Sequence, residues 1–126
     1  MRAVLDTSVL LAGDVQPLEG ELAISAATLA ELQFGVLVTA AAGIRAERLR
    51  RLSEIQRTFD ALPVDEVVAT SYGELAAAIV AAGRRPRSRV MDILIAATAH
   101  AHSARLYTRN AADLAGIGHL VDIVPV

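Results

Sequence analysis

Four carboxylates stand apart from other charges in stretches of the sequence that are otherwise apolar. Asp6, Glu31 and Asp92 are each the only Asp, Glu, Lys or Arg in a long run of residues, and Asp113 is the only acid between Asp92 and Asp122. A carboxylate in apolar surroundings is costly unless it is paired or bound to a cation. The sequence has no Lys, so its organic partners are limited to Arg and His. A divalent metal is the simpler explanation, and oxygen-only ligands favour Mg²⁺ or Mn²⁺.

Each of these acids also has an ordinary structural explanation. Asp6, Asp92 and Asp113 could cap or begin helices, where the helix dipole favours a negative charge. Glu31 could lie on a narrow solvent-facing stripe of its helix. We nevertheless expect this helix to be buried, because apolar residues surround it on nearly all sides. Because these explanations are independent of one another, all four would have to hold at once, and a shared site is the better interpretation.

Short apolar strands that alternate with helices predict how the acids are positioned. The strands are expected at 2–5, 22–24, 61–64, 105–108 and 121–124. The helices are expected at about 7–13, 26–42, 44–60, 66–82, 89–103 and shortly after 110. The expected helix boundaries are N-caps at Ser25, Asp65, Ser88 and Asn110, and C-terminal glycines at Gly43 and Gly83.

This alternation is typical of an α/β sandwich with a mostly parallel sheet. The carboxyl ends of parallel strands share one rim, where ligands bind. Asp6 and Asp113 follow strands, and Asp92 lies in the first turn of a helix, so all three are expected at this rim. Glu31 lies about two turns into its helix, and its approach depends on the tilt of that helix.

The length and composition indicate one domain over residues 1–126 and exclude several kinds of chemistry. With 54% hydrophobic residues the chain can bury a core, so disorder is not expected. The absence of Cys excludes disulfides and thiol catalysis, and the absence of Lys excludes Schiff-base chemistry and the P-loop. No leader peptide or long apolar span is recognisable. We therefore expect a soluble, cytoplasmic protein that does not bind membranes.

Four segments around the acids carry a family resemblance. They read VLDTSVL at 4–10, TLAEL at 28–32, MDILIAATA at 91–99 and LYTRNAADL at 106–114. Together, in this order and spacing, they resemble the PIN-domain ribonucleases, and more narrowly the VapC toxins of bacterial toxin–antitoxin pairs. The departure is Leu114, where many relatives carry Phe, and we expect it to change packing only.

The resemblance implies a PIN-like α/β/α sandwich with a mostly parallel five-stranded sheet, a Mg²⁺ or Mn²⁺ site and an RNA substrate. The four acids of the family fall, in order, on Asp6, Glu31, Asp92 and Asp113. Asp6 and Asp92 are the expected direct ligands, and the other two act through water or complete a second site. An activated water would attack an RNA phosphodiester in line and leave a 5′-phosphate and a 3′-hydroxyl. The resemblance also implies a homodimer and a neutralising VapB-type antitoxin, which by analogy faces the acidic pocket and the 44–60 helix.

Other polar residues near the acids are candidates for supporting roles. Thr7, Ser8, Thr108 and Asn110 could direct hydroxyl or amide groups into the site, and they are equally suited to capping. Several arginines could contact RNA phosphates, which would set the register of the RNA rather than read its sequence. These arginines are Arg84, Arg85, Arg87, Arg89 and Arg109. The alternative is that they are simply solvated.

Two other metal-dependent classes with parallel sheets are excluded by the residues present. A phosphoacceptor receiver domain needs a Lys, and a haloacid-dehalogenase-like phosphatase needs an Asp where Ser8 stands as well as a Lys. The main alternative is a metal-binding module that holds RNA or a partner without cleaving it. A structural α/β domain with coincidental acids is the third possibility.

Overall fold

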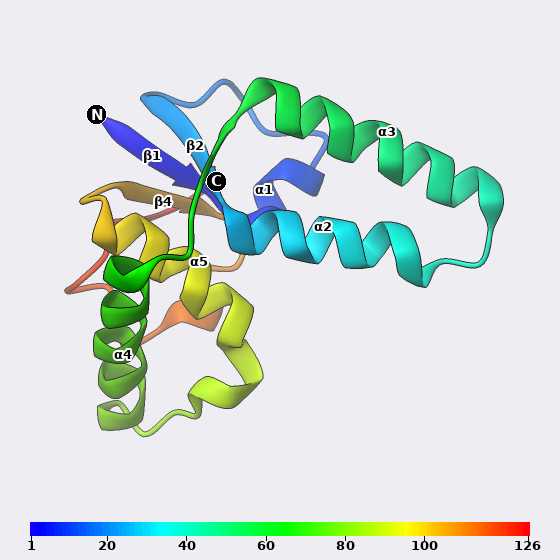
Figure 1. The fold of residues 1–126 in the computed structure, drawn as a ribbon. Coiled ribbons are helices and arrows are strands. Elements are labelled where there is room, and N and C mark those ends of the chain that lie inside the picture. The colour runs from blue at the N-terminus through cyan, green and yellow to red at the C-terminus, as the bar shows by residue number, and fades with distance from the viewer.

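A five-stranded parallel sheet forms the centre of the protein (Figure 1). The computed structural model describes residues 1–126. The strand order is β3-β2-β1-β4-β5, and every neighbouring pair is parallel. The bounds are Arg2–Leu5 (β1), Glu21–Ser25 (β2), Asp60–Leu62 (β3), Arg105–Thr108 (β4) and Ile123–Pro125 (β5). The expected α/β class and the parallel five-stranded sheet are confirmed.

Helices pack on both faces of this sheet. Their bounds are Thr7–Leu11 (α1), Ala26–Val38 (α2), Ala42–Thr58 (α3), Glu66–Ala81 (α4) and Val90–Ala101 (α5), with two short 3-10 helices at Pro86–Arg89 (η1) and Ala111–Leu114 (η2). Successive residues of β1 face two separate cores, as the two-residue period of a strand requires. Val4 packs in the core formed with α4 and α5, whereas Ala3 and Leu5 pack in the core that includes α1 and α3. None of the helices combines the length and apolar character needed to cross a bilayer.

The register between β1 and β4 places the ends of these two strands side by side. Leu5 lies opposite Tyr107 in the ladder, and the backbone N–H of Asp6 donates to the Tyr107 carbonyl at 2.9 Å. Asp6 and Thr108, the residues that follow this pair, are therefore neighbours at the carboxyl rim of the sheet. The strand pairing thus joins two of the four sequence segments that carried the family resemblance.

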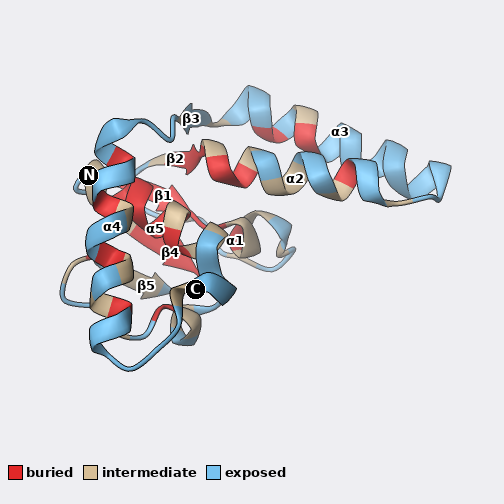
Figure 2. Ribbon diagram, turned by 60° about the horizontal axis from the view of Figure 1, so that its bottom comes forward, coloured by how far each residue is buried: buried red, intermediate tan, exposed pale blue.

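Helices α2 and α3 form a hairpin that projects beyond the sheet (Figures 1 and 2). Only Ala27, Thr28 and Val36 of α2 are buried. Phe34 and Leu37 are exposed at 67% and 63%, so the expectation of a buried helix around Glu31 was wrong. The reason is geometric: α2 leaves the sheet after its first turns, and beyond that point it packs mainly against α3.

Two expected helix boundaries were also wrong, and each has a local cause. Helix α2 ends at Val38, where Thr39 turns to extended backbone, so Gly43 lies inside the first turn of α3 instead of closing α2. Ser88 does not cap α5, because Pro86 starts a 3-10 helix and the Ser88 hydroxyl donates to the Arg85 carbonyl at 3.3 Å. The last strand also begins two residues later than expected, at Ile123.

Two other helix starts behave as predicted because a side-chain oxygen accepts a free backbone N–H. The Ser25 hydroxyl accepts from the Ala27 N–H at 3.1 Å at the start of α2. The Asp65 carboxylate accepts from the Val68 N–H at 3.1 Å at the start of α4.

The packing of α3 against the sheet gives a test of the fold. Ile55 is 7% exposed and belongs to the core with Ala3 and Leu5, whereas Ile44, on the same helix, is 51% exposed. We expect Ile55→Ala to lower the free energy of unfolding by about 2–4 kcal/mol, because it removes buried methyl groups and leaves a cavity. Urea denaturation measures this change. Ile44→Ala is the matched control and should change stability by less than about 0.5 kcal/mol; equal losses in both variants would contradict this placement of α3.

Candidate functional site

Asp6 is the most firmly held of the four acids. It is 6% exposed and follows β1 directly, as the N-cap of α1. One carboxylate oxygen accepts from the Thr7 N–H at 2.9 Å, and the other accepts from the Ser8 hydroxyl at 2.8 Å and the Thr108 hydroxyl at 2.7 Å. Asp6 is thus a helix cap and also a fixed carboxylate, because an ionised carboxyl has about four acceptor sites and three are in use.

Glu31 is connected to the same region through Thr7. The Thr7 hydroxyl donates to Glu31 Oε1 at 2.7 Å and lies 3.0 Å from the Thr28 hydroxyl. A hydroxyl has one proton and a carboxylate can only accept, so in this arrangement Thr28 donates to Thr7. Thr28 is fully buried on α2 and was not singled out from the sequence. Its position three residues before Glu31, on the same helix face, was the available signal.

Asp92 lies in the first turn of α5 and is half-buried. Burial raises its pKa above the ordinary value of 3.8, and the negative charges of Asp6, Glu31 and Asp113 raise it further, while Arg89 opposes them. The three other acids are therefore close enough to Asp92 to repel it. The fold brings the four sequence-predicted acids into one electrostatic neighbourhood.

Asp113 lies on η2, beyond the end of β4, and forms an ion pair within the chain. Its Oδ1 lies 3.1 Å from Nη2 of Arg89, at the junction between η1 and α5. Both side chains are partly exposed, at 33% and 43%. Asn110 precedes η2 but its side chain makes no capping bond, so its expected N-cap role was wrong; its backbone N–H donates to the Thr108 hydroxyl at 3.0 Å instead.

The acids are gathered but do not converge on one point. No group of three His, Asp or Glu side chains is arranged to hold a metal ion together. The available donors are carboxylates, which Mg²⁺ and Mn²⁺ prefer as ligands. Burial and the neighbouring acids disfavour the negative charge of Asp92, and a bound cation would stabilise that charge. Mg²⁺ also commonly keeps several waters, so it needs only one or two direct carboxylate ligands. The residues therefore fit a hydrated divalent cation.

Two helices that carry acids are joined by a buried pair of hydroxyls. Ser25 Oγ lies 2.8 Å from Thr98 Oγ1, where the start of α2 meets α5. Thr98 donates to the Leu94 carbonyl at 2.8 Å, so Ser25 is the donor to Thr98. This contact joins the helix of Glu31 to the helix of Asp92, and no local pattern indicates it because the two residues are 73 positions apart.

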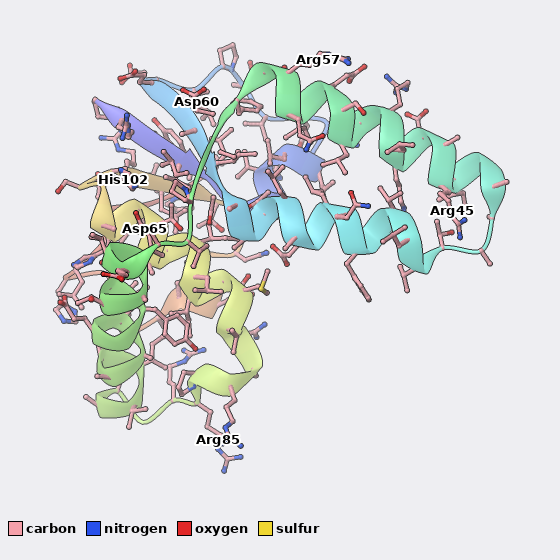
Figure 3. All side chains as sticks on the ribbon, in the orientation of Figure 1. Arg45, Arg57, Asp60, Asp65, Arg85 and His102 are labelled. Carbon is pink, nitrogen blue, oxygen red and sulfur yellow. The ribbon has the colours of Figure 1, made fainter.

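The five arginines proposed for RNA contact have different surroundings. Arg84, Arg85 and Arg87 are exposed and form no ion pair, and Figure 3 shows Arg85 extending away from the body of the protein. Arg109 forms an ion pair with Asp14, and its backbone N–H donates to Ser8, so it is less available than the sequence suggested. Arg87 and Arg89 line a hollow of about 320 Å³ whose wall also includes Glu31 and Asp92.

Comparisons with known proteins identify the family of this chain. The PIN domain family matches residues 3–117. Ribonuclease VapC8 of Mycobacterium tuberculosis is 40% identical over 100 residues, which cover 76% of this chain and 88% of that protein. Ribonuclease VapC5 of the same organism is 35% identical over 113 residues, 85% of this chain and 82% of that protein. A crystal structure of VapBC-5 from M. tuberculosis, a member of the VapBC family of toxin–antitoxin systems, superposes with a TM-score of 0.82 at 32% identity, covering 99% of this chain and 97% of the other.

The parallel five-stranded sheet with helices on both faces is the α/β/α architecture of a PIN domain. The match over residues 3–117 and the similarity to the VapC ribonucleases show that this chain belongs to the PIN domain family, in its VapC group.

The burial of Asp92 and its repulsion by the other acids predict that removing its charge stabilises the metal-free protein. Because the pKa of Asp92 is higher in the folded than in the unfolded chain, ionisation of this group lowers stability as the pH rises above 3.8. In a chelator at pH 7, we expect Asp92→Asn to raise Tm by on the order of 2 °C and to weaken the fall in stability with pH. Asp60→Asn, at an exposed carboxylate on β3, is the control and should leave Tm unchanged. A lower Tm for Asp92→Asn would contradict a crowded acid cluster.

The bond between Thr108 and Asp6 predicts a measurable loss when the hydroxyl is removed. Thr108→Val keeps the shape of this fully buried side chain but leaves Asp6 with one donor fewer and the Asn110 N–H without its acceptor. We expect the free energy of unfolding in urea to fall by about 1–3 kcal/mol. Thr108→Ser retains the hydroxyl and should lose less than Thr108→Val. A serine variant as unstable as the valine variant would show that the methyl group, not the hydrogen bonds, stabilises this position.

Proposed function

We propose that this protein is an endoribonuclease that depends on Mg²⁺ or Mn²⁺ and acts as the toxin of a VapBC-type toxin–antitoxin pair in the cytoplasm. The observation that carries the proposal is the gathering of Asp6, Glu31, Asp92 and Asp113 at the carboxyl rim of the sheet, expressed in the raised pKa of Asp92. Its relatives named ribonucleases support the RNA-cleaving activity. The whole chain, 1–126, is proposed to act as a single nuclease domain.

Asp6 and Asp92 are the residues proposed to hold the metal directly, with Glu31 and Asp113 acting through water or at a second ion. A bound divalent cation would supply positive charge that acidifies a water molecule and stabilises the transition state at the phosphate. Asp6 is suited to this role because Thr7, Ser8 and Thr108 fix both of its oxygens before any ligand arrives. Thr7 in turn orients Glu31 through its hydroxyl.

The surface around the acids is suited to the approach of RNA. Twelve arginines oppose fourteen acidic residues in the whole chain, and because four of those acids belong to the site, the remaining surface has a small excess of positive charge. Arg84, Arg85 and Arg87 are exposed, form no ion pair and lie a few residues before the start of α5. They are proposed to contact phosphates along the RNA, which positions the strand without reading its bases.

The exposed apolar residues of the α2–α3 hairpin support a protein partner. Phe34, Leu37 and Val38 of α2 are each at least 60% exposed, and apolar groups gathered in this way mark interaction surfaces. A hollow of about 470 Å³ between α1, α2 and α3 opens beside Thr7 and Glu31, so a partner seated there would also contact one of the four acids, Glu31. We assign this surface to a VapB-type antitoxin, in line with the VapBC assembly named for the similar structure. The homodimer implied by the family resemblance stays a prediction.

RNA cleavage by purified, antitoxin-free protein tests the proposed function. We expect total RNA to be cut at discrete positions with Mn²⁺ or Mg²⁺, and the cutting to stop with a chelator. Asp92→Asn should reduce the rate by on the order of 100-fold or more, because it removes a proposed metal ligand, while Asp60→Asn should retain full activity. Cleavage that continues in the chelator would contradict a metal-dependent enzyme. Metal and RNA binding without any cleavage would instead favour the alternative of a binding module.

A further inference from the structure

Arg89 is the only arginine of the chain that forms an ion pair with one of the four site acids. Its guanidinium contacts Asp113 at 3.1 Å and also lies close enough to Asp92 to lower the pKa of that carboxyl. One positive side chain therefore faces two of the four acids. In the metal-free protein it supplies part of the countercharge that a cation would otherwise provide.

The position of Arg89 is fixed by the backbone, whereas its side chain can exchange partners. Pro86 begins η1, and Arg89 is the last residue of η1 and the one that precedes α5. Its side chain is 43% exposed and that of Asp113 is 33% exposed, so the ion pair is accessible to water and ions. Exposed pairs of this kind are weak and easily broken by a stronger competitor.

A hollow beside the acids offers the guanidinium a second partner. Arg89 and Arg87 line it together with Glu31 and Asp92, so positive groups and acids border the same hollow. A phosphate that lies between a cation held by the acids and an arginine is bound by both, and the planar guanidinium can donate two parallel hydrogen bonds to its oxygens. The hollow has the groups needed to bind the phosphate of an RNA strand.

We propose that Arg89 exchanges partners during binding: it neutralises Asp113 in the metal-free protein, and when the acids hold a divalent cation its guanidinium would leave Asp113 and bind the RNA phosphate beside Asp92. This inference rests on the proposed function, because it needs both the cation and the RNA. It requires that Arg89 has opposite effects on the affinities for the cation and for RNA. As a competitor it weakens metal binding, and as a phosphate ligand it strengthens RNA binding.

The test measures both ligands in Arg89→Gln. Isothermal titration of antitoxin-free protein with Mn²⁺ should show about two- to fivefold tighter binding than in the wild type, because the competing charge is gone. With the RNA species that the wild type cleaves, KM should rise by about five- to tenfold while kcat changes by less than about twofold. Arg87→Gln is the matched control: it lines the same hollow but does not contact Asp113, so Mn²⁺ affinity should be unchanged while KM rises.

The possible outcomes separate this inference from the proposed function. Equal Mn²⁺ affinity in Arg89→Gln and wild type would overturn the exchange and leave the metal-dependent activity standing. Weaker Mn²⁺ binding in Arg89→Gln, with urea unfolding unchanged, would also overturn it, because Arg89 would then be positioning Asp113 rather than competing with the cation. A wild type that binds no Mn²⁺ would overturn both the proposed function and the exchange.

Discussion

The pairing of β1 with β4 determines where the candidate site is and how rigid it is. This ladder places Asp6 beside Thr108, although more than a hundred residues separate them, and their hydrogen bond is buried. The other two donors to Asp6 come from Thr7 and Ser8, which its own helix cap brings into place. A single carboxylate thus connects a strand ladder, a helix start and a second strand. The remaining acids are arranged around a group that cannot move without disrupting the central sheet.

The other three acids are positioned by separate elements and remain more adjustable. Glu31 comes from α2, Asp92 from α5 and Asp113 from η2, and the chain gives these groups fewer partners than it gives Asp6. Burial raises the pKa of Asp92 most, the charges of the other three acids raise it further, and Arg89 opposes them. Such an arrangement lowers the stability of the metal-free protein and favours the binding of a cation that neutralises the acids. One fixed acid and three adjustable ones can adapt to a hydrated ion without a preformed cage.

The sequence predicted those parts of the molecule that depend on local patterns. Buried parallel strands are continuous apolar runs, and Ser25 and Asp65 cap helices through their own side chains, so both could be recognised. The four acids could be found because each lies alone among apolar residues. The failures came from contacts distant in sequence. Nothing near Arg109 indicated its pairing with Asp14, and the apolar character of α2 predicted burial, although in the single chain it forms an exposed hairpin.

The buried contact between Ser25 and Thr98 joins the two helices that carry Glu31 and Asp92. Each acid lies six residues from this contact along its own helix, Glu31 after Ser25 and Asp92 before Thr98. Six helical residues span about 9 Å, so both acids lie at the ends of arms of equal length. A change of a few degrees in the crossing angle of α2 and α5 changes the separation of the two carboxylates without breaking a strand pair. The distance between these two carboxylates therefore depends on helix packing, whereas the position of Asp6 depends on strand pairing.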